Sequence, residues 1–178
     1  MDIRKKYYSM NKLVFVFLLA AIAVQGQDGE KSKAYFNKGI QQFAQGKSKE
    51  AIVSFDMAIN FDSTNYDAWI KRGFCKGKIG DFEGEMSDYT RVIEVDPKHK
   101  WAYISRGGAY NRMSKFDAAI SDFNSAITID PSDAEAYNNR GFARKGLGDK
   151  EGACSDWNKS KKLGNDEAKI ILKNNLCK

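Results

Sequence analysis

The sequence repeats itself every 34 residues, and this period constrains the fold more than any other feature. Five columns of related residues keep the spacing through four consecutive units: glycines, aromatic residues four positions earlier, a second aromatic set, turn residues and apolar closing residues. In that order the columns are Gly39, Gly73, Gly107 and Gly141; Tyr35, Trp69, Tyr103 and Tyr137; Phe55, Tyr89, Phe123 and Trp157; Gly46, Gly80, Ser114 and Gly148; and Phe61, Val95, Ile129 and Leu163. We therefore place repeats at residues 32–65, 66–99, 100–133 and 134–167, followed by an amphipathic segment at 166–178.

Each repeat is predicted to form two helices joined by a turn. Apolar residues have helical spacing, as at Ile120, Phe123 and Ile127. The turn residue separates the helices, and the Asp-Pro pairs at 96–97 and 130–131 end the second helix, because proline cannot continue it. The glycine column lets the two helices approach, and the second aromatic column fills the neighbouring space. One hairpin cannot bury its apolar face, so the repeats are expected to stack into an all-α solenoid.

These residues resemble the tetratricopeptide repeat (TPR) family. The third repeat carries the pattern as Tyr103, Arg106-Gly107, Ala119, Phe123, Ala126 and Asp130-Pro131. The resemblance covers residues 32–167 and implies a right-handed superhelix whose first helices line a concave groove, with residues 166–178 as a capping helix. Glu85 departs from the pattern, which has a small alanine there; we interpret this as a matter of local packing.

The resemblance also implies which residues face a partner. The family's groove positions give a surface that is apolar in the early repeats and adds Lys78, Arg112 and Lys145 later. We expect an extended or helical segment of another protein, with apolar anchors and some acidic character, to bind there. The predicted partner-groove residues are Lys33, Phe36, Ile40, Phe43, Ile70, Phe74, Lys78, Trp101, Ile104, Asn111, Arg112, Asn138, Phe142 and Lys145.

Alternatives to this surface remain open. Phe36, Ile70 and Ile104 fit packing between repeats equally well. The array is alternatively a structural module that associates with itself. Binding of chaperone tails is not expected, because family members that bind them carry paired lysine and asparagine on the first groove helix, where this chain has Phe36 and Ile40.

Two charged columns share the 34-residue period. The basic column is Lys38, Arg72, Arg106 and Arg140, and the acidic column is Asp88, Asp122 and Asp156. A basic column suggests phosphate binding, but ion pairing between the columns explains both without a ligand, with the long stems covering apolar surface. We therefore predict a structural role for them.

Residues 1–26 are predicted to be a cleaved secretory signal peptide. A basic segment precedes the apolar run at 13–24, which is shorter than the roughly 20 residues that span a bilayer, and small residues follow. An uncleaved anchor is the alternative. Cleavage would leave a short linker at 27–31 and no stable membrane span. We expect a periplasmic or secreted protein, and the lysine- and asparagine-rich composition is compatible with a Gram-negative bacterium.

Export permits disulfides, which makes the positions of the three cysteines informative. Cys154 and Cys177 flank a helix stop and a helix start at residues 163–166. Two antiparallel helices joined there would place the two cysteines opposite each other. We predict a disulfide between them, with two thiols as the alternative. Cys75 is expected to be a small core residue.

Composition and motifs argue against catalysis and nucleic-acid binding. The chain has a single histidine and lacks a Gly-rich phosphate loop, a Cys-x-x-Cys pair and a nucleophile elbow, so we expect no enzyme activity, metal site or cofactor. The formal net charge is +6, and half of it comes from the predicted signal peptide. This modest charge and the predicted export argue against a nucleic-acid partner. The predicted function is a protein–protein interaction scaffold outside the cytosol.

Overall fold

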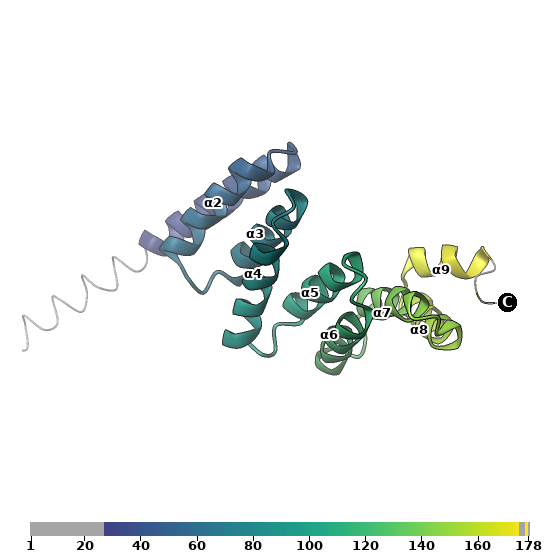
Figure 1. Cartoon of the computed structure of the whole chain (residues 1–178). Helices are drawn as coiled ribbons and strands as arrows, with labels where there is room; N and C mark the ends of the chain where they lie inside the picture. Colours follow the sequence, from purple (N-terminus) through teal and green to yellow (C-terminus); the bar gives the residue numbers. More distant parts are fainter. Residues whose placement is uncertain (1–26, 175–176, 178) are drawn as a thin grey trace, which may run out of the picture. The chain divides into compact units, whose positions relative to one another are not determined.

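The computed structural model describes residues 27–174 and residue 177, and all regular structure in them is α-helical (Figure 1). The predicted signal peptide, residues 1–26, lies outside the described residues. The chain divides into two compact units, residues 1–68 and 69–178. Each repeat of the described chain is a helix pair, so the all-α helix-turn-helix array predicted from the period is confirmed.

The first repeat forms a helix pair in the first unit. Its helices are residues 27–44 and α2 (Ser48–Phe61). The Tyr35 ring stacks on Phe61 with centroids 5.6 Å apart, and the Phe36 ring lies 5.8 Å from that of Phe55. Phe55 is fully buried, so aromatic contacts join the two helices.

The prediction of a linker at residues 27–31 is wrong, because these residues are helical and continue into the first repeat. Lys31 Nζ lies 3.4 Å from the Asp28 carboxylate and 5.1 Å from the ring centroid of Phe61. An ion pair three residues apart supports a helical turn, and the segment has no proline to prevent one.

The remaining repeats and a final helix follow along the chain. They comprise α3 (Tyr66–Lys78), α4 (Phe82–Val95), α5 (Lys100–Arg112), α6 (Phe116–Ile129), α7 (Ala134–Gly146), α8 (Lys150–Lys162) and α9 (Asp166–Lys173). From α4 onward each helix packs against the next one, and α5 also contacts α7 (Figure 1). The first helices of the third and fourth repeats therefore lie side by side.

The turn column adopts one backbone conformation. Gly46, Gly80 and Gly148 have φ values of 76°, 86° and 81°, in the left-handed region that glycine enters readily. Ser114 occupies the same place in the third repeat with φ 56° and is the only non-glycine residue with positive φ in the described chain. The turn geometry therefore holds even where the residue has a side chain.

The glycine column is where the two helices of a repeat touch. A Cβ built on Gly107 would lie 2.8 Å from the Phe123 ring, closer than packed atoms come. The same relation joins Gly39 to Phe55, Gly73 to Tyr89 and Gly141 to Trp157. These four rings are at most 1% exposed, so each glycine allows a large aromatic residue to be buried against the facing backbone.

The third and fourth repeats share small apolar clusters. Phe123 of α6 packs with Ala143 of α7. Ile104 packs with Ala126 and Ala136, which come from α6 and α7. Because these clusters combine residues of both repeats, the two repeats stabilise one another.

The charged columns form ion pairs within repeats. Arg106 donates from Nε and Nη2 to the two carboxylate oxygens of Asp122, both at 2.8 Å, and these hydrogen bonds raise the pKa of Arg106. Its Nη1 donates to Thr90 Oγ1 on α4 at 3.2 Å, and the guanidinium lies 6.0 Å from the ring centroid of Tyr103. Equivalent bidentate pairs join Arg72 to Asp88 and Arg140 to Asp156.

Helix α9 covers the end of the last repeat. Gly164 has φ 98°, and the Asn165 side chain accepts a hydrogen bond from Ala168 N at 2.9 Å, which starts α9 where the sequence predicted a helix start. Ala168 and Ile171 pack with Trp157 of α8. The helix ends at Lys173, short of the predicted capping segment at 166–178.

The Cys154–Cys177 disulfide predicted from the spacing is present, with Cα atoms 5.5 Å apart. It ties the chain beyond α9 to α8. Cys75 is a free thiol that is 1% exposed, and burial raises its pKa to about 11. This thiol is therefore protonated at neutral pH.

We expect Gly107→Ala to lower the free energy of unfolding by about 1–3 kcal/mol, because the added methyl group overpacks the Phe123 contact. The adjacent Gly108→Ala is the matched control. A Cβ at Gly108 meets only Arg112 Nη1, at 3.9 Å, so this variant should keep or raise stability by up to about 1 kcal/mol. Urea unfolding followed by circular dichroism measures both, and equal losses would show that the contact at Gly107 is not specific.

We expect Arg106→Met to cost about 3 kcal/mol, because Asp122 is 5% exposed and would keep a buried charge without its partner. Arg91→Met is the control, since Arg91 is 57% exposed beside Glu94 and its loss should change stability by less than about 0.5 kcal/mol. Thermal unfolding distinguishes a structural role of the basic column from a ligand-binding role. An unchanged Tm together with lost partner binding would assign Arg106 to a ligand.

Candidate functional site

A cavity of about 510 Å³ lies along α3, α5 and α7. Residues of α5 supply its centre at intervals of three or four, so they follow one face of that helix. We call this cavity the groove; it is lined by Phe74, Tyr89, Trp101, Ile104, Ser105, Gly108, Asn111, Arg112, Glu135, Asn139 and Phe142.

Six of the predicted partner residues meet in the groove: Phe74, Trp101, Ile104, Asn111, Arg112 and Phe142. Trp101 is 48% exposed, Phe74 37% and Phe142 36%, so these rings are open to solvent. Ile104 is 4% exposed and forms the floor, because Ala126 and Ala136 pack against it. Of the two roles considered for Ile104, packing between repeats is therefore the one that the structure shows.

Other predicted partner residues do not line the groove. Asn138 is 2% exposed and donates from Nδ2 to Glu167 of α9 at 2.7 Å, so the prediction that it faces a partner is wrong. Ile70 is half-buried, and Lys145 is exposed outside the groove. In the first unit Lys33 is exposed, whereas three apolar residues are half-buried: Phe36, Ile40 and Phe43.

Polar groups give the groove a defined character. Asn111 Nδ2 donates to the backbone oxygen of Asn139 at 3.0 Å and so links α5 to α7. Its Oδ1 is buried without a hydrogen-bond partner among the described residues. Burial raises the pKa of Glu135, and the nearby Asp133 carboxylate raises it further. The groove therefore combines apolar rings with a hydrogen-bond acceptor and ionisable groups.

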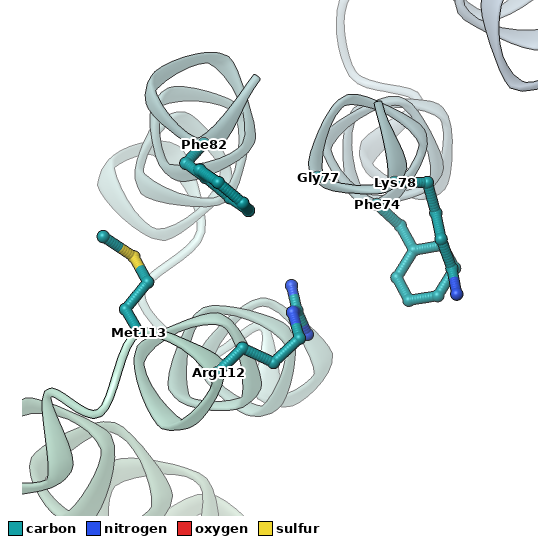
Figure 2. A pocket seen from close by; sticks show the side chains of 6 residues that line it. All are labelled: Phe74, Gly77, Lys78, Phe82, Arg112 and Met113. Atoms are coloured by element: carbon teal, nitrogen blue, oxygen red, sulfur yellow. The ribbon is translucent and has the colours of Figure 1, made fainter. Parts of the chain in front are cut away.

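A second cavity of about 570 Å³ adjoins the groove and shares Phe74 and Arg112 with it. Figure 2 shows Phe82 and Arg112 reaching from α4 and α5 into the space that Phe74 and Lys78 of α3 border. We call this cavity the Arg112 pocket; it is lined by Phe74, Gly77, Lys78, Phe82, Arg112 and Met113.

A buried carboxylate stands behind the Arg112 pocket. Glu85 is 1% exposed, accepts a hydrogen bond from Tyr89 Oη at 3.2 Å and pairs with Nη2 of Arg112. Burial and this carboxylate raise the pKa of Tyr89. The Glu85 carboxylate fills the space that a Cβ on Gly77 would take. Glu85 is therefore part of the site, and not only the packing departure that the sequence suggested.

The arrangement is suited to binding. In the described residues no group of three or more His, Cys, Asp or Glu side chains is placed to hold a metal ion. No helix in the part of the chain that the structure describes is long and apolar enough to cross a membrane. The groove and the Arg112 pocket offer apolar surface, cations and hydrogen-bonding groups, which are the elements of a peptide-binding surface.

Known families match two stretches of the chain. Residues 66–99 match a model described as tetratricopeptide repeat, and residues 107–148 match one described as TPR repeat. A comparison with curated protein sequences gave no match.

Several solved structures have a similar fold. A thermophilic TPR protein of Thermus thermophilus is 17% identical with a TM-score of 0.70, over 80% of this chain and 82% of that one. YrrB, a TPR protein with an unusual peptide-binding site, is 19% identical with a TM-score of 0.67, over 97% of this chain and 98% of that chain. The first TPR domain of Spaghetti, bound to an HSP90 peptide, is 31% identical with a TM-score of 0.59, over 64% of this chain and 94% of that domain.

The identity to the Spaghetti domain extends over nearly all of that domain, and two repeats match the family models. The helix pairs, the left-handed turns and the glycine–aromatic contacts recur with the same 34-residue period. The chain therefore belongs to the tetratricopeptide repeat family.

Proposed function

We propose that the protein is a non-enzymatic scaffold that binds a peptide or helical segment of another protein in the groove on α3, α5 and α7. Domains of this family generally mediate protein–protein or peptide binding. The observation that carries the proposal is that Phe74, Trp101 and Phe142 are each more than a third exposed to solvent and all line a single cavity. Exposed apolar side chains that gather in one place mark binding surfaces.

The ligand that fits the groove is a segment with apolar anchors and an acidic group. Fully burying a large apolar side chain is worth about 1.5–3 kcal/mol, and the partly covered rings would each contribute a share of this. Arg112 favours a carboxylate near the α3 side of the groove.

Two relatives support peptide binding as the activity. YrrB has a peptide-binding site described as unusual, and the Spaghetti domain holds an HSP90 peptide. A chaperone tail is not the ligand we propose here, because the first groove helix carries Phe36 and Ile40 where tail-binding members carry lysine and asparagine. The right-handed superhelix implied by the resemblance stays a prediction.

A photo-crosslinking amino acid at position 108 tests the groove. Gly108 lines the groove and has room for a side chain. Irradiation in the native compartment should give a covalent adduct with a partner protein, and Trp101→Ala with Phe142→Ala should weaken adduct formation by at least about tenfold, which corresponds to about 1.4 kcal/mol. Mass spectrometry identifies the adduct.

Val95→Ala with Ile170→Ala is the control pair, because both residues are about as exposed as Trp101 and neither lines the groove. This pair should leave the adduct unchanged. Adducts that persist in the folded Trp101→Ala and Phe142→Ala variant would move the site away from the groove. Adducts between two copies of the chain would show self-association in place of partner binding.

We also propose that the protein acts outside the cytosol. The Cys154–Cys177 bond supports this, because structural disulfides persist in oxidising compartments. The predicted signal peptide at residues 1–26 agrees with export.

Mass spectrometry of the protein from its source tests export. We expect a chain that begins near residues 23–27 and, in denaturant, one alkylatable thiol before reduction and three after, since Cys75 is the free thiol. Three alkylatable thiols before reduction, or a retained N-terminus, would contradict the proposal.

A further inference from the structure

The chain contains a closed counterpart of the Arg112 pocket one period further on. Phe116 begins α6 and Gly146 ends α7, and the Phe116 ring occupies the space where a Cβ on Gly146 would lie. Phe116 packs against the cluster of Phe123 and Ala143 and is half-buried. At this interface between repeats an aromatic ring therefore closes over the end of the next helix.

The equivalent residues of the second and third repeats are Phe82 and Arg112. Arg112 stands where the closed interface has Gly146, and its side chain lines the pocket together with Phe82. Phe82 is left 47% exposed, and the cavity beside it remains open. The open interface thus has an arginine where the closed one has a glycine.

Two further changes hold the arginine in place. Glu85 replaces the alanine found at Ala119 and pairs with Arg112 Nη2, while Gly77 makes room for the Glu85 carboxylate. Burying the Glu85 carboxylate carries a desolvation cost that its half-exposed partner Arg112 only partly offsets, and the closed interface of this same chain is the apolar alternative. The open, charged version is therefore better explained by a ligand than by stability.

The charges of the pocket favour an anionic group. Arg112 is half exposed, and its guanidinium has five N–H donors of which Nη2 contacts Glu85. Lys78 is a second, exposed cation at the rim. The buried Glu85 offsets one of these two charges, so the mouth of the pocket keeps a net positive charge. Phe74, Phe82 and Met113 supply apolar walls.

We propose that the Arg112 pocket is an anchor subsite that takes a large apolar side chain together with a neighbouring carboxylate from a peptide. The apolar side chain lies between Phe74, Phe82 and Met113, and the carboxylate accepts hydrogen bonds from Arg112 and Lys78. The subsite rests on the proposed peptide-binding function, because the pocket is continuous with the groove through Phe74 and Arg112. Arg112, oriented by Glu85, would determine specificity for acidic neighbours.

The probe for this subsite is the dipeptide N-acetyl-Asp-Phe-amide, added to protein labelled with ¹³C at the methionine methyl groups. The NMR signal of the Met113 methyl group should shift until it saturates as the dipeptide is added. The signal of Met57, which does not line the pocket, should keep its position. N-acetyl-Asn-Phe-amide should bind at least about fivefold more weakly, because it lacks the charge. Equal binding of the two dipeptides, or of N-acetyl-Lys-Phe-amide, overturns the proposal.

The double variant Glu85→Ala with Arg112→Gly copies the closed interface, where Ala119 and Gly146 hold these places. This variant should let Phe82 close the pocket, and its affinity for the dipeptide should fall by at least about tenfold. Arg91→Gln is the matched control and should bind normally, because Arg91 lies away from the pocket. If the double variant does not fold, Phe82→Ala serves instead, since this exposed ring can be removed without opening the core, and it should weaken the dipeptide by about fivefold.

The two proposals fail in different ways. Position-108 adducts that persist while the dipeptide leaves Met113 unshifted overturn the subsite and keep the groove. A saturable Met113 shift without any position-108 adduct keeps the subsite and overturns the groove. Wild-type affinity for the dipeptide in the folded double variant overturns the subsite.

Discussion

The contact between a glycine and an aromatic ring, made once in every repeat, is the constraint on which the rest of the structure depends. Where Gly107 meets Phe123 the helices come close enough for the preceding residues, Arg106 and Asp122, to form their bidentate pair. The ion pair and the apolar contact are therefore neighbours on the same two helices. The ring also reaches Ala143 of the next repeat, so one contact organises both the hairpin and the stack.

The first repeat shows which of these two interactions is essential. Gly39 still meets Phe55, but the preceding residues are Lys38, which is exposed, and Ser54, whose hydroxyl donates to Gln42 Oε1 at 2.5 Å. The helix pair forms without the bidentate pair. The apolar contact is thus the constant part of the repeat, and the charged columns add to it where both partners are present.

The sequence predicted what the repeats have in common and missed what makes them differ. The 34-residue period identifies the turn at Ser114 and the buried ring at Phe123, because the other three repeats carry equivalent residues at the same positions. It cannot show that Glu85 reaches Arg112, 27 positions later on the next repeat, since such a pair occurs once. Asn138 was misplaced for a similar reason: its partner, Glu167, belongs to α9, which follows the last repeat.

A repeat array tolerates such a local change because each repeat interacts mainly with its neighbours, so that stability is close to a sum over hairpins and interfaces. The open Arg112 pocket leaves Phe82 exposed at one interface, while Phe116 packs closely on Gly146 at the next. At the end of the array the Cys154–Cys177 bond closes a loop across α9, and loop-closure entropy alone is worth about 3 kcal/mol. An array whose C-terminal end and neighbouring interface are stabilised in this way can keep one interface partly apolar, charged and open to solvent, which a single-core protein of this size could do only at the expense of its core.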